Sequence, residues 1–227
     1  MDVITNKYVS ADYKGLIKII KSGYPLMEII WMVFEMGFLA KINSLRYSFF
    51  SKGENVIIHP KSRINASNYI SLGNDVLIQQ GVWLNVPLHQ ITAIKKNGRA
   101  IIKIGDRTRI GPRTTISAIG LIEVESDVLI GLNVIIEDHL HSFIDTQKPI
   151  LNQGIVNRGN IIIRSGCWIA SNSVIVSSGK KLEIGRGSII SANTVVKESV
   201  EDYTIVSGNP ARVVKRYNNK LKRWVSE

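Results

Sequence analysis

The sequence predicts an all-β solenoid, because aliphatic residues recur at every sixth position and small or β-branched residues recur four positions after them. A helix needs a 3.6-residue period, whereas short strands joined by tight turns fit a period of six. The aliphatic set is Leu72, Ile78, Leu84, Ile104, Ile110, Ile116, Val124, Ile130, Ile136, Ile163, Ile169, Ile175, Ile184, Ile190 and Val196. The second set is Val76, Val82, Thr108, Thr114, Val128, Val134, Cys167, Ser173, Ser188 and Thr194.

Six-residue units are too short to form a domain alone, but stacked units bury one continuous column of side chains. Three units in each run indicate three faces per coil. Both sets point inward, and the Gly that often follows an aliphatic residue, as in Leu72-Gly73, permits a tight turn. We therefore expect a triangular prism over residues 54–206, with five full coils and a partial coil at Ile58 and Ile64. A chance pattern in an ordinary β-sandwich is the alternative.

Two long gaps interrupt the repeat and predict loops. One spans about 86–100 and contains His89, and the other spans about 137–160 and contains Asp138, His139 and His141. Functional residues often lie on loops that a rigid scaffold holds in place. We expect these two loops to carry the site, although loops that only cover a neighbouring subunit would give the same gaps.

Residues 1–53 lack the repeat and predict a helical N-terminal extension, and residues 207–227 predict a basic C-terminal segment with a short helix. The apolar stretch 29–34 lies between Glu28 and Glu35, so it is too short and too charged to span a bilayer. We expect an amphipathic cap or trimer contact, with a membrane-surface segment as the alternative. Because the sequence shows no cleavable signal pattern, we expect a cytoplasmic location. The basic charge alone suggests, in addition, a location at the inner membrane face.

The net charge of +11 is large for a cytoplasmic enzyme and is consistent with anionic partners. It is concentrated near the C-terminus and in the N-terminal segment. No aromatic RNA-binding pattern or zinc-finger spacing accompanies it, so we expect no nucleic-acid partner. A phosphorylated cofactor or a lipid-linked anionic substrate accounts for the charge. Cys167 occupies an inward repeat position and is expected in the core rather than as a nucleophile.

The repeat, the histidine-bearing loop and the segment Ser207-Gly208-Asn209-Pro210-Ala211-Arg212-Val213-Val214-Lys215 resemble the hexapeptide-repeat acyltransferases over about 54–217. The Gly-Asn-Pro-Ala element resembles the branch of sugar O-acetyltransferases that includes galactoside and maltose acetyltransferases and polysaccharide-modifying enzymes. The resemblance implies a left-handed parallel β-helix, a homotrimer with sites between subunits, acetyl-CoA as acyl donor, a saccharide acceptor and no metal. Ser177–Gly185 departs from the family's Pro-Gly-Val pattern.

The resemblance also implies a single histidine as general base, which takes the proton of the acceptor hydroxyl. Counted five residues from the last coil aliphatic, this histidine is His141, with His139 as the alternative. Asp138 or Glu137 would orient the imidazole, and Asn85 would lie near the acceptor. For CoA binding, the resemblance implies Ser171, Ala192, Gly208, Asn209, Arg212 and Lys215, and the departure from the family pattern adds Lys180, or Lys181, as a phosphate contact.

The function expected is acetyl-CoA-dependent O-acetylation of a sugar hydroxyl in a surface polysaccharide or its precursor. N-acetylation of a nucleotide-linked amino sugar is the alternative, although the N-terminal part lacks a Gly-x-Gly-x-x-Gly turn. A non-catalytic trimeric scaffold is a further alternative. A carbonic anhydrase of the same fold would need three histidine ligands, and the spacing of His59, His89, His139 and His141 does not resemble that motif.

Overall fold

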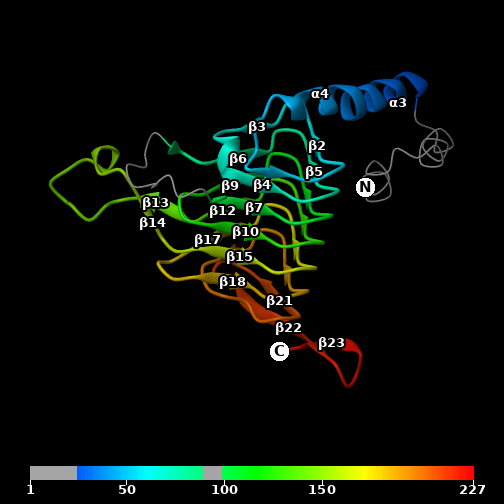
Figure 1. The fold of residues 1–227 in the computed structure, drawn as a ribbon. Coiled ribbons are helices and arrows are strands. Elements are labelled where there is room, and N and C mark those ends of the chain that lie inside the picture. Colours follow the sequence, from blue (N-terminus) through cyan, green and yellow to red (C-terminus); the bar gives the residue numbers. More distant parts are fainter. Residues whose placement is uncertain (1–24, 89–98) are drawn as a thin grey trace.

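Three parallel sheets form the walls of a prism in the computed structural model, which describes residues 25–88 and 99–227 (Figure 1). Sheet A contains β1 (Ser51–Lys52), β4 (Ile70–Leu72), β7 (Ile102–Ile104), β10 (Ile122–Val124), β15 (Ile161–Ile163) and β18 (Leu182–Ile184). Sheet B begins with β2 (Ile57–Ile58), β5 (Leu77–Ile78), β8 (Arg109–Ile110), β11 (Leu129–Ile130), β16 (Trp168–Ile169) and β19 (Ile189–Ile190). Sheet C contains β3 (Arg63–Ile64), β6 (Trp83–Asn85), β9 (Thr115–Ser117), β12 (Ile135–Glu137), β17 (Val174–Val176) and β20 (Val195–Val196).

The chain visits the sheets in the order A, B, C once per coil, which confirms the parallel β-helix. Six coils are complete rather than five, because β1 pairs with β4 and supplies the first strand of the coil that contains Ile58 and Ile64. The β-helix therefore starts at Ser51, inside the 1–53 segment assigned to the N-terminal extension.

The six-residue repeat fills the core as predicted. Every residue of the aliphatic set is at most 3% exposed, and the register stacks equivalent positions, as in Ile110 against Ile130 and Ile130 against Ile169. The second set is equally buried. Its hydroxyls donate to backbone carbonyls, for example from Thr114 to Gly131 at 2.9 Å, so the polar atoms in the core are satisfied.

The repeat glycines serve close packing between coils and not the turn geometry that the sequence suggested. A Cβ on Gly105 would lie 2.6 Å from the backbone carbon of Glu125 in the next coil, although its φ is not positive. The left-handed turn positions fall on other residues, among them Asp127 and Asn133. Asp and Asn tolerate this conformation better than most residues, and Gly81, Gly166 and Gly187 occupy the same turn position elsewhere in the β-helix.

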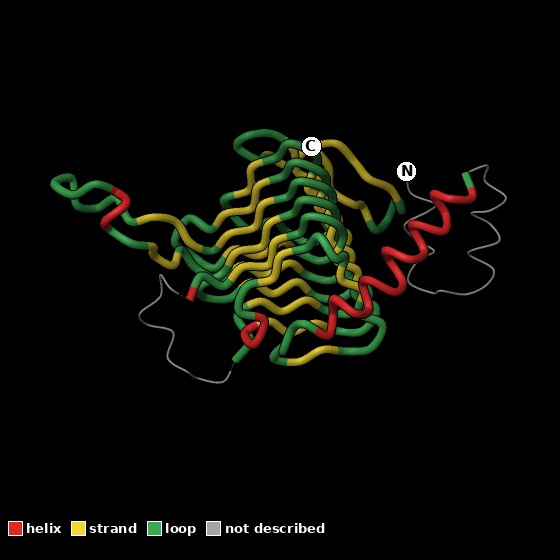
Figure 2. Tube along the Cα trace, turned by 90° about the horizontal axis from the view of Figure 1, so that it is seen from above, coloured by secondary structure: helices red, strands yellow, loops and turns green. Residues whose placement is uncertain are grey.

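A helical segment lies across the N-terminal end of the prism (Figures 1 and 2). It consists of α3 (Leu26–Val33), the π-helical η1 (Phe34–Leu39) and α4 (Ala40–Leu45). The buried Asn43 donates to the carbonyls of Ile58 and His59 at 3.4 and 3.3 Å, which ties α4 to β2. No helix in the described part of the chain is long and apolar enough to cross a membrane.

The C-terminal segment forms strands, so the expected short helix is wrong. Sheet B continues with β21 (Thr204–Ser207), which is parallel to β19, and then with β22 (Arg212–Asn218) and β23 (Arg223–Ser226), which are antiparallel. β22 and β23 are rich in Val, Tyr and Trp, which favour strands, and the edge of sheet B offers them unpaired backbone groups. Segments as short as β22 and β23, with seven and four residues, are also too short to form a stable isolated helix.

The second loop contains its own hairpin, formed by β13 (His139–His141) and β14 (Ile155–Asn157), followed toward the tip by η4 (Ile150–Asn152). It projects from the prism on the side opposite to the free end of the helical segment (Figures 1 and 2). A short 3-10 turn, η2 (Ser67–Tyr69), precedes β4. Most of the first loop, including His89, lies outside the described residues.

Candidate functional site

A buried carboxylate marks the base of the second loop. Asp138 is 0% exposed, and its two oxygens accept hydrogen bonds from the backbone N–H groups of Ile119, Gly120 and Leu121 at 2.9, 2.8 and 3.0 Å. These donors belong to the turn between β9 and β10, one coil earlier. Each of these N–H groups needs a hydrogen-bond acceptor, and both oxygens of a carboxylate act as acceptors, so the three donors match the Asp138 side chain.

His139 is held between this carboxylate and a serine. Its Nδ1 lies 3.1 Å from Oδ1 of Asp138, and its Nε2 lies 3.5 Å from Oγ of Ser117. Since the carboxylate can only accept, Nδ1 carries the hydrogen and Nε2 keeps a lone pair. The imidazole is therefore oriented with its basic nitrogen toward Ser117, as an Asp–His pair arranged for proton transfer requires.

A ladder of polar side chains continues from His139 along the edge of sheet C. The buried Asn85 donates through Nδ2 to Oγ of Ser117 at 2.9 Å, and Asn65 donates to Oδ1 of Asn85 at 3.2 Å. Asn85 and Ser117 are paired in register on β6 and β9. With Nε2 of His139 as acceptor, the direction of every hydrogen bond is fixed, and each points toward Asp138.

The structure thus brings together three of the four predicted catalytic residues, namely Asn85, Asp138 and His139. The sequence interpretation missed Ser117 and Asn65. The signal was present, because Ser117 and Asn85 occupy the same position after an inward aliphatic residue in consecutive coils, and the sheet register places such residues side by side.

His141 lies two residues further along β13. It is exposed, and its side chain makes no hydrogen bond to the described part of the chain. In the single subunit, His141 therefore lacks the orienting contacts that His139 has.

The residues predicted to bind CoA lie at another corner of the prism. Ser171 and Ala192 lie in the turns that lead from sheet B to sheet C, and Gly208 directly follows β21. They are stacked in successive layers, since Asn193 N donates to Ser171 O at 3.1 Å and Val195 N donates to Gly208 O at 3.0 Å. The catalytic candidates lie on the opposite edge of sheet C, where the chain passes from sheet C to sheet A.

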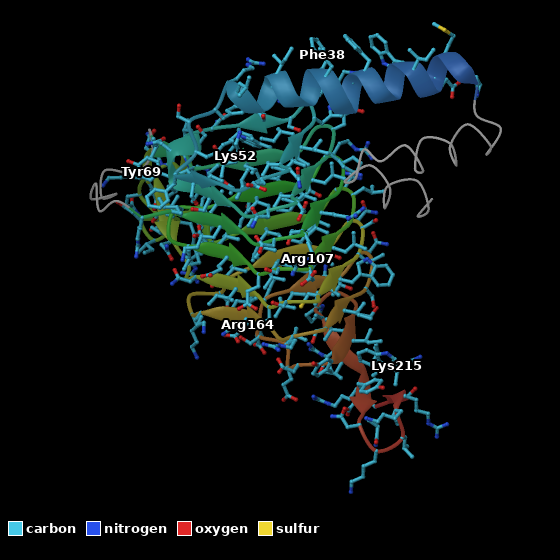
Figure 3. All side chains as sticks on the ribbon, turned by 45° about the vertical axis from the view of Figure 1, so that its right-hand side comes forward. Phe38, Lys52, Tyr69, Arg107, Arg164 and Lys215 are labelled. Carbon is cyan, nitrogen blue, oxygen red and sulfur yellow. The ribbon has the colours of Figure 1, made fainter. Side chains whose placement is uncertain are left out.

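The predicted basic contacts are divided between the two corners. Arg212 and Lys215 lie on β22 and are exposed, as is Asn209 before them, and Lys215 extends into solvent in Figure 3. Lys180 lies instead in the turn from β17 to β18, on the catalytic side, where its carbonyl accepts a hydrogen bond from Ser177 at 2.5 Å. A single subunit does not bring Lys180 near the stack of Ser171, Ala192 and Gly208.

No group of three or more His, Cys, Asp or Glu side chains within residues 25–88 and 99–227 is arranged to hold a metal ion. The distinctive chemical group among the described side chains is the oriented imidazole of His139.

No family model matches the chain. It is 27% identical over 133 residues to WbbJ of Escherichia coli, whose assigned role is O-acetyl transfer in lipopolysaccharide biosynthesis, a match that covers 56% of this chain and 66% of WbbJ. It is 33% identical over 123 residues to a protein of Mycobacterium tuberculosis assigned as an acetyltransferase, a match that covers 54% of this chain and 39% of that protein. The chain thus spans less than two thirds of the length of these relatives.

Among solved structures, the chain is similar to AntD, an N-acyltransferase from Bacillus cereus, in its complex with dTDP and 3-hydroxybutyryl-CoA. The TM-score is 0.64 at 23% identity, with 82% of this chain and 92% of that chain covered, which shows a shared fold. The chain is thus similar in sequence to acetyltransferases and in fold to AntD, and its six-residue repeat builds a parallel β-helix.

Proposed function

We propose that the chain is an acetyl-CoA-dependent O-acetyltransferase that modifies a sugar hydroxyl in a surface polysaccharide or its precursor. The observation that carries the proposal is the His139 imidazole, whose Nδ1 faces the buried Asp138 and whose Nε2 faces the Ser117–Asn85 ladder. A hydroxyl must lose its proton as it attacks, and an imidazole oriented by a carboxylate is the usual base for this step. WbbJ, the O-acetyl transferase relative, supports the sugar O-acetylation branch.

In this mechanism His139 is the base, in preference to His141. The acceptor oxygen attacks the thioester carbonyl carbon while its proton passes to Nε2 of His139. The tetrahedral intermediate collapses with cleavage of the carbon–sulfur bond, and the imidazolium returns the proton to the departing CoA sulfur. Asp138 stabilises the imidazolium, and the Ser171 N–H remains our proposed donor to the oxyanion.

The separation of the two groups of residues supports a site shared between subunits. The catalytic candidates and the stack of Ser171, Ala192 and Gly208 lie on opposite edges of sheet C, so the catalytic corner of one subunit would face the CoA corner of another. Leu129 and Trp168 form an apolar pair on the outer face of sheet B. Each is 47% exposed, and the pair suits a contact between subunits. We therefore propose the homotrimer that the resemblance implies.

The acceptor proposed is a glycan unit that is assembled on a lipid carrier at the cytoplasmic face of the inner membrane. The charge of +11 suits both this anionic setting and the phosphates of CoA. Arg212, Lys215 and Lys180 are the proposed phosphate contacts, and Asn209 the proposed contact beside the pantetheine arm.

The test is acetyl transfer from radiolabelled acetyl-CoA to a panel of free sugars, nucleotide sugars and lipid-linked glycans. His139→Ala should lose at least 100-fold in kcat, the typical contribution of a general base, while His141→Ala should stay within about fivefold of the parent. The reverse result would overturn the choice of His139. Transfer only to amino sugars would favour the N-acetyltransferase alternative, and failure to bind CoA would favour the scaffold.

A further inference from the structure

The helical segment 26–45 carries a continuous stripe of large apolar side chains that nothing in the described structure covers. Its members are Met27, Ile30, Trp31, Phe34, Phe38, Ile42 and Leu45, which are between 40% and 77% exposed. Steps of mostly three or four residues place them on one helix face. The Trp31, Phe34 and Phe38 rings are in contact, with centroids 5.9 and 5.5 Å apart, so the stripe is unbroken at its centre.

The orientation of the stripe is fixed by contacts on the other side of the helix. Asn43 donates to two carbonyls of β2 and the loop after it, and Glu35 lies 3.6 Å from Nζ of Lys61 and 3.8 Å from Nε2 of His59. Phe38, labelled in Figure 3, points away from the β-helix. The stripe cannot turn inward unless these contacts break, among them the buried hydrogen bonds of Asn43.

The exposed area is on the order of several hundred Å², as large as the largest apolar patches that soluble monomers usually carry. β-Helices that pack side by side meet through their sheets, whereas the helical segment that carries this stripe lies across the N-terminal end of the prism (Figure 1). Trimer formation of that kind would leave it uncovered.

Charge decides between the two remaining occupants, a second copy packed end to end and a lipid surface. Residues 25–63 contain five Lys and Arg against three Asp and Glu, and Arg46, Lys52 and Arg63 are exposed around this end. Two copies that met through this end would bring like charges together, which opposes association. An anionic bilayer is complementary to the same charge, and a Trp- and Phe-bearing helix face is typical of helices that lie in the membrane interface.

We propose that this stripe is a membrane-docking surface that lies on anionic phospholipid with Trp31, Phe34 and Phe38 at its centre. In a trimer of parallel β-helices, three such stripes would face the same way and bind one bilayer together, which strengthens the attachment of the whole assembly. The surface acts independently of acetyl transfer, since none of its residues belongs to the candidate site.

The experiment is co-sedimentation of the full-length chain with vesicles of phosphatidylcholine alone and of phosphatidylcholine mixed with phosphatidylglycerol in equal parts. The parent should bind the anionic vesicles, and added salt should weaken the binding. The double variant Trp31→Glu/Phe38→Glu should bind them at least tenfold more weakly. The matched control Leu151→Glu/Leu221→Glu changes the charge equally at exposed apolar residues on the second loop and the C-terminal hairpin, and should bind within twofold of the parent.

Both double variants should fold like the parent, because all four substituted residues are at least 55% exposed. Circular dichroism and the thermal midpoint check this. Equal binding by both double variants, or no binding of the parent to anionic vesicles, would overturn the proposal. A stripe variant that only reduces the oligomer size in light scattering, without changing vesicle binding, would assign the stripe to a second copy. Absence of acetyl transfer together with intact vesicle binding would count against the proposed function and not against the membrane-docking surface.

Discussion

Replacement of Asp138 by Asn tests the proposed base most directly, since it alters one buried group with little change in shape. The Asp138 oxygens accept three backbone hydrogen bonds and face Nδ1 of His139. If the Asn oxygen keeps the bonds from Gly120 and Leu121, its NH₂ group opposes the N–H of Ile119. One orphaned buried N–H, together with the change of two charge-assisted bonds to neutral ones, costs about 3 kcal/mol of unfolding free energy.

The effect on activity follows from the same change. The Asn NH₂ group donates to Nδ1 of His139, so the ring hydrogen moves to Nε2 and the basic lone pair no longer faces the acceptor. The comparable substitution in a Ser–His–Asp triad lowers kcat by about 10⁴, and we expect a loss of similar size in kcat. Urea unfolding followed by circular dichroism gives the stability, and thiol release from acetyl-CoA with the acceptor found in the panel gives kcat.

Asp127→Asn is the matched control, because this carboxylate is half exposed and its main partner is the exposed Arg107. Its loss should change stability far less and leave kcat unaltered. A folded Asp138→Asn protein whose kcat stays within threefold of the parent would refute the role of the Asp–His pair. An unchanged urea midpoint would refute the hydrogen-bond argument.

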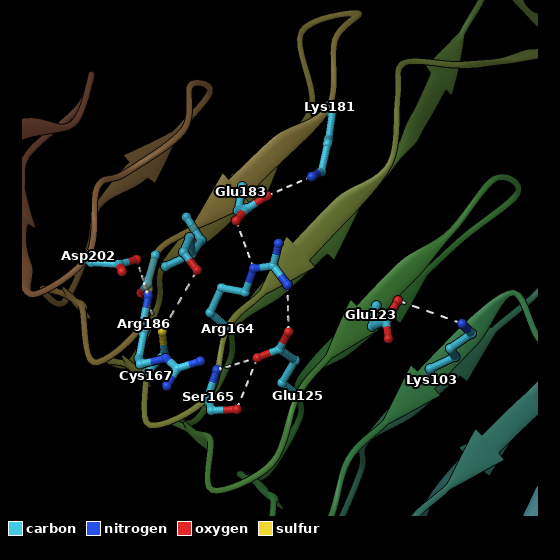
Figure 4. A network of polar contacts seen from close by, with 12 residues as sticks. Lys103, Glu123, Glu125, Arg164, Ser165, Cys167, Lys181, Glu183, Arg186 and Asp202 are labelled. Atoms are coloured by element: carbon cyan, nitrogen blue, oxygen red, sulfur yellow. Dashed lines mark hydrogen bonds and ion pairs between the residues drawn. The ribbon is translucent and has the colours of Figure 1, made fainter.

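Three further predictions concern the β-helix. Gly159→Ala should destabilise the fold by about 3 kcal/mol in urea unfolding, because φ is +110° and a Cβ would lie 2.2 Å from a backbone oxygen of the neighbouring turn. Gly154→Ala, with nothing within 4 Å, should cost about 1 kcal/mol, and equal losses would contradict the steric explanation. Burial raises the pKa of Cys167 to about 11, so the thiol should resist iodoacetamide at pH 8 until urea unfolds the protein, and rapid labelling of the native protein would refute this. Hydrogen bonding from Arg164 lowers the pKa of Glu183 from 4.5 to about 2 (Figure 4). This stabilisation is complete above pH 4.5 and is lost as the pH falls toward 2, so thermal midpoints should fall more steeply there in the parent than in Arg164→Ala, and parallel curves would count against it.

The sequence predicted the core well because the repeat is itself a packing pattern. Each inward position meets the same kind of residue in the coils on either side, so periodicity alone identifies Ile110, Ile130 and Ile169 as neighbours. The repeat did not predict the C-terminal strands, because β22 and β23 pair antiparallel at an edge and carry no six-residue signal.

The choice between His139 and His141 depended on information that the sequence does not hold. Both lie on one short strand, where residues two apart point to the same face, and counting from Ile136 favours His141. What distinguishes His139 is its contact with Ser117 and with Asp138, whose carboxylate is fixed by backbone N–H groups. Backbone donors leave no signature in side-chain identity, so this distinction required the structure.

The coil geometry explains why the polar ladder and the loop meet at one place. Asn85 and Ser117 end the strands of sheet C in the second and third coils, and Glu137 ends the strand of the fourth coil, in register with Ser117. The chain leaves the prism directly after Glu137, so Asp138 turns back to the N–H groups of the coil before it, and His139 then lies beside Ser117. In a parallel β-helix, equivalent repeat positions of successive coils form a row of side chains. The loop inserted after the fourth coil adds the imidazole of His139 to the end of that row. The same loop inserted one coil later would leave His139 beside Glu137 and not Ser117, so the place of the insertion determines which side chains the imidazole meets.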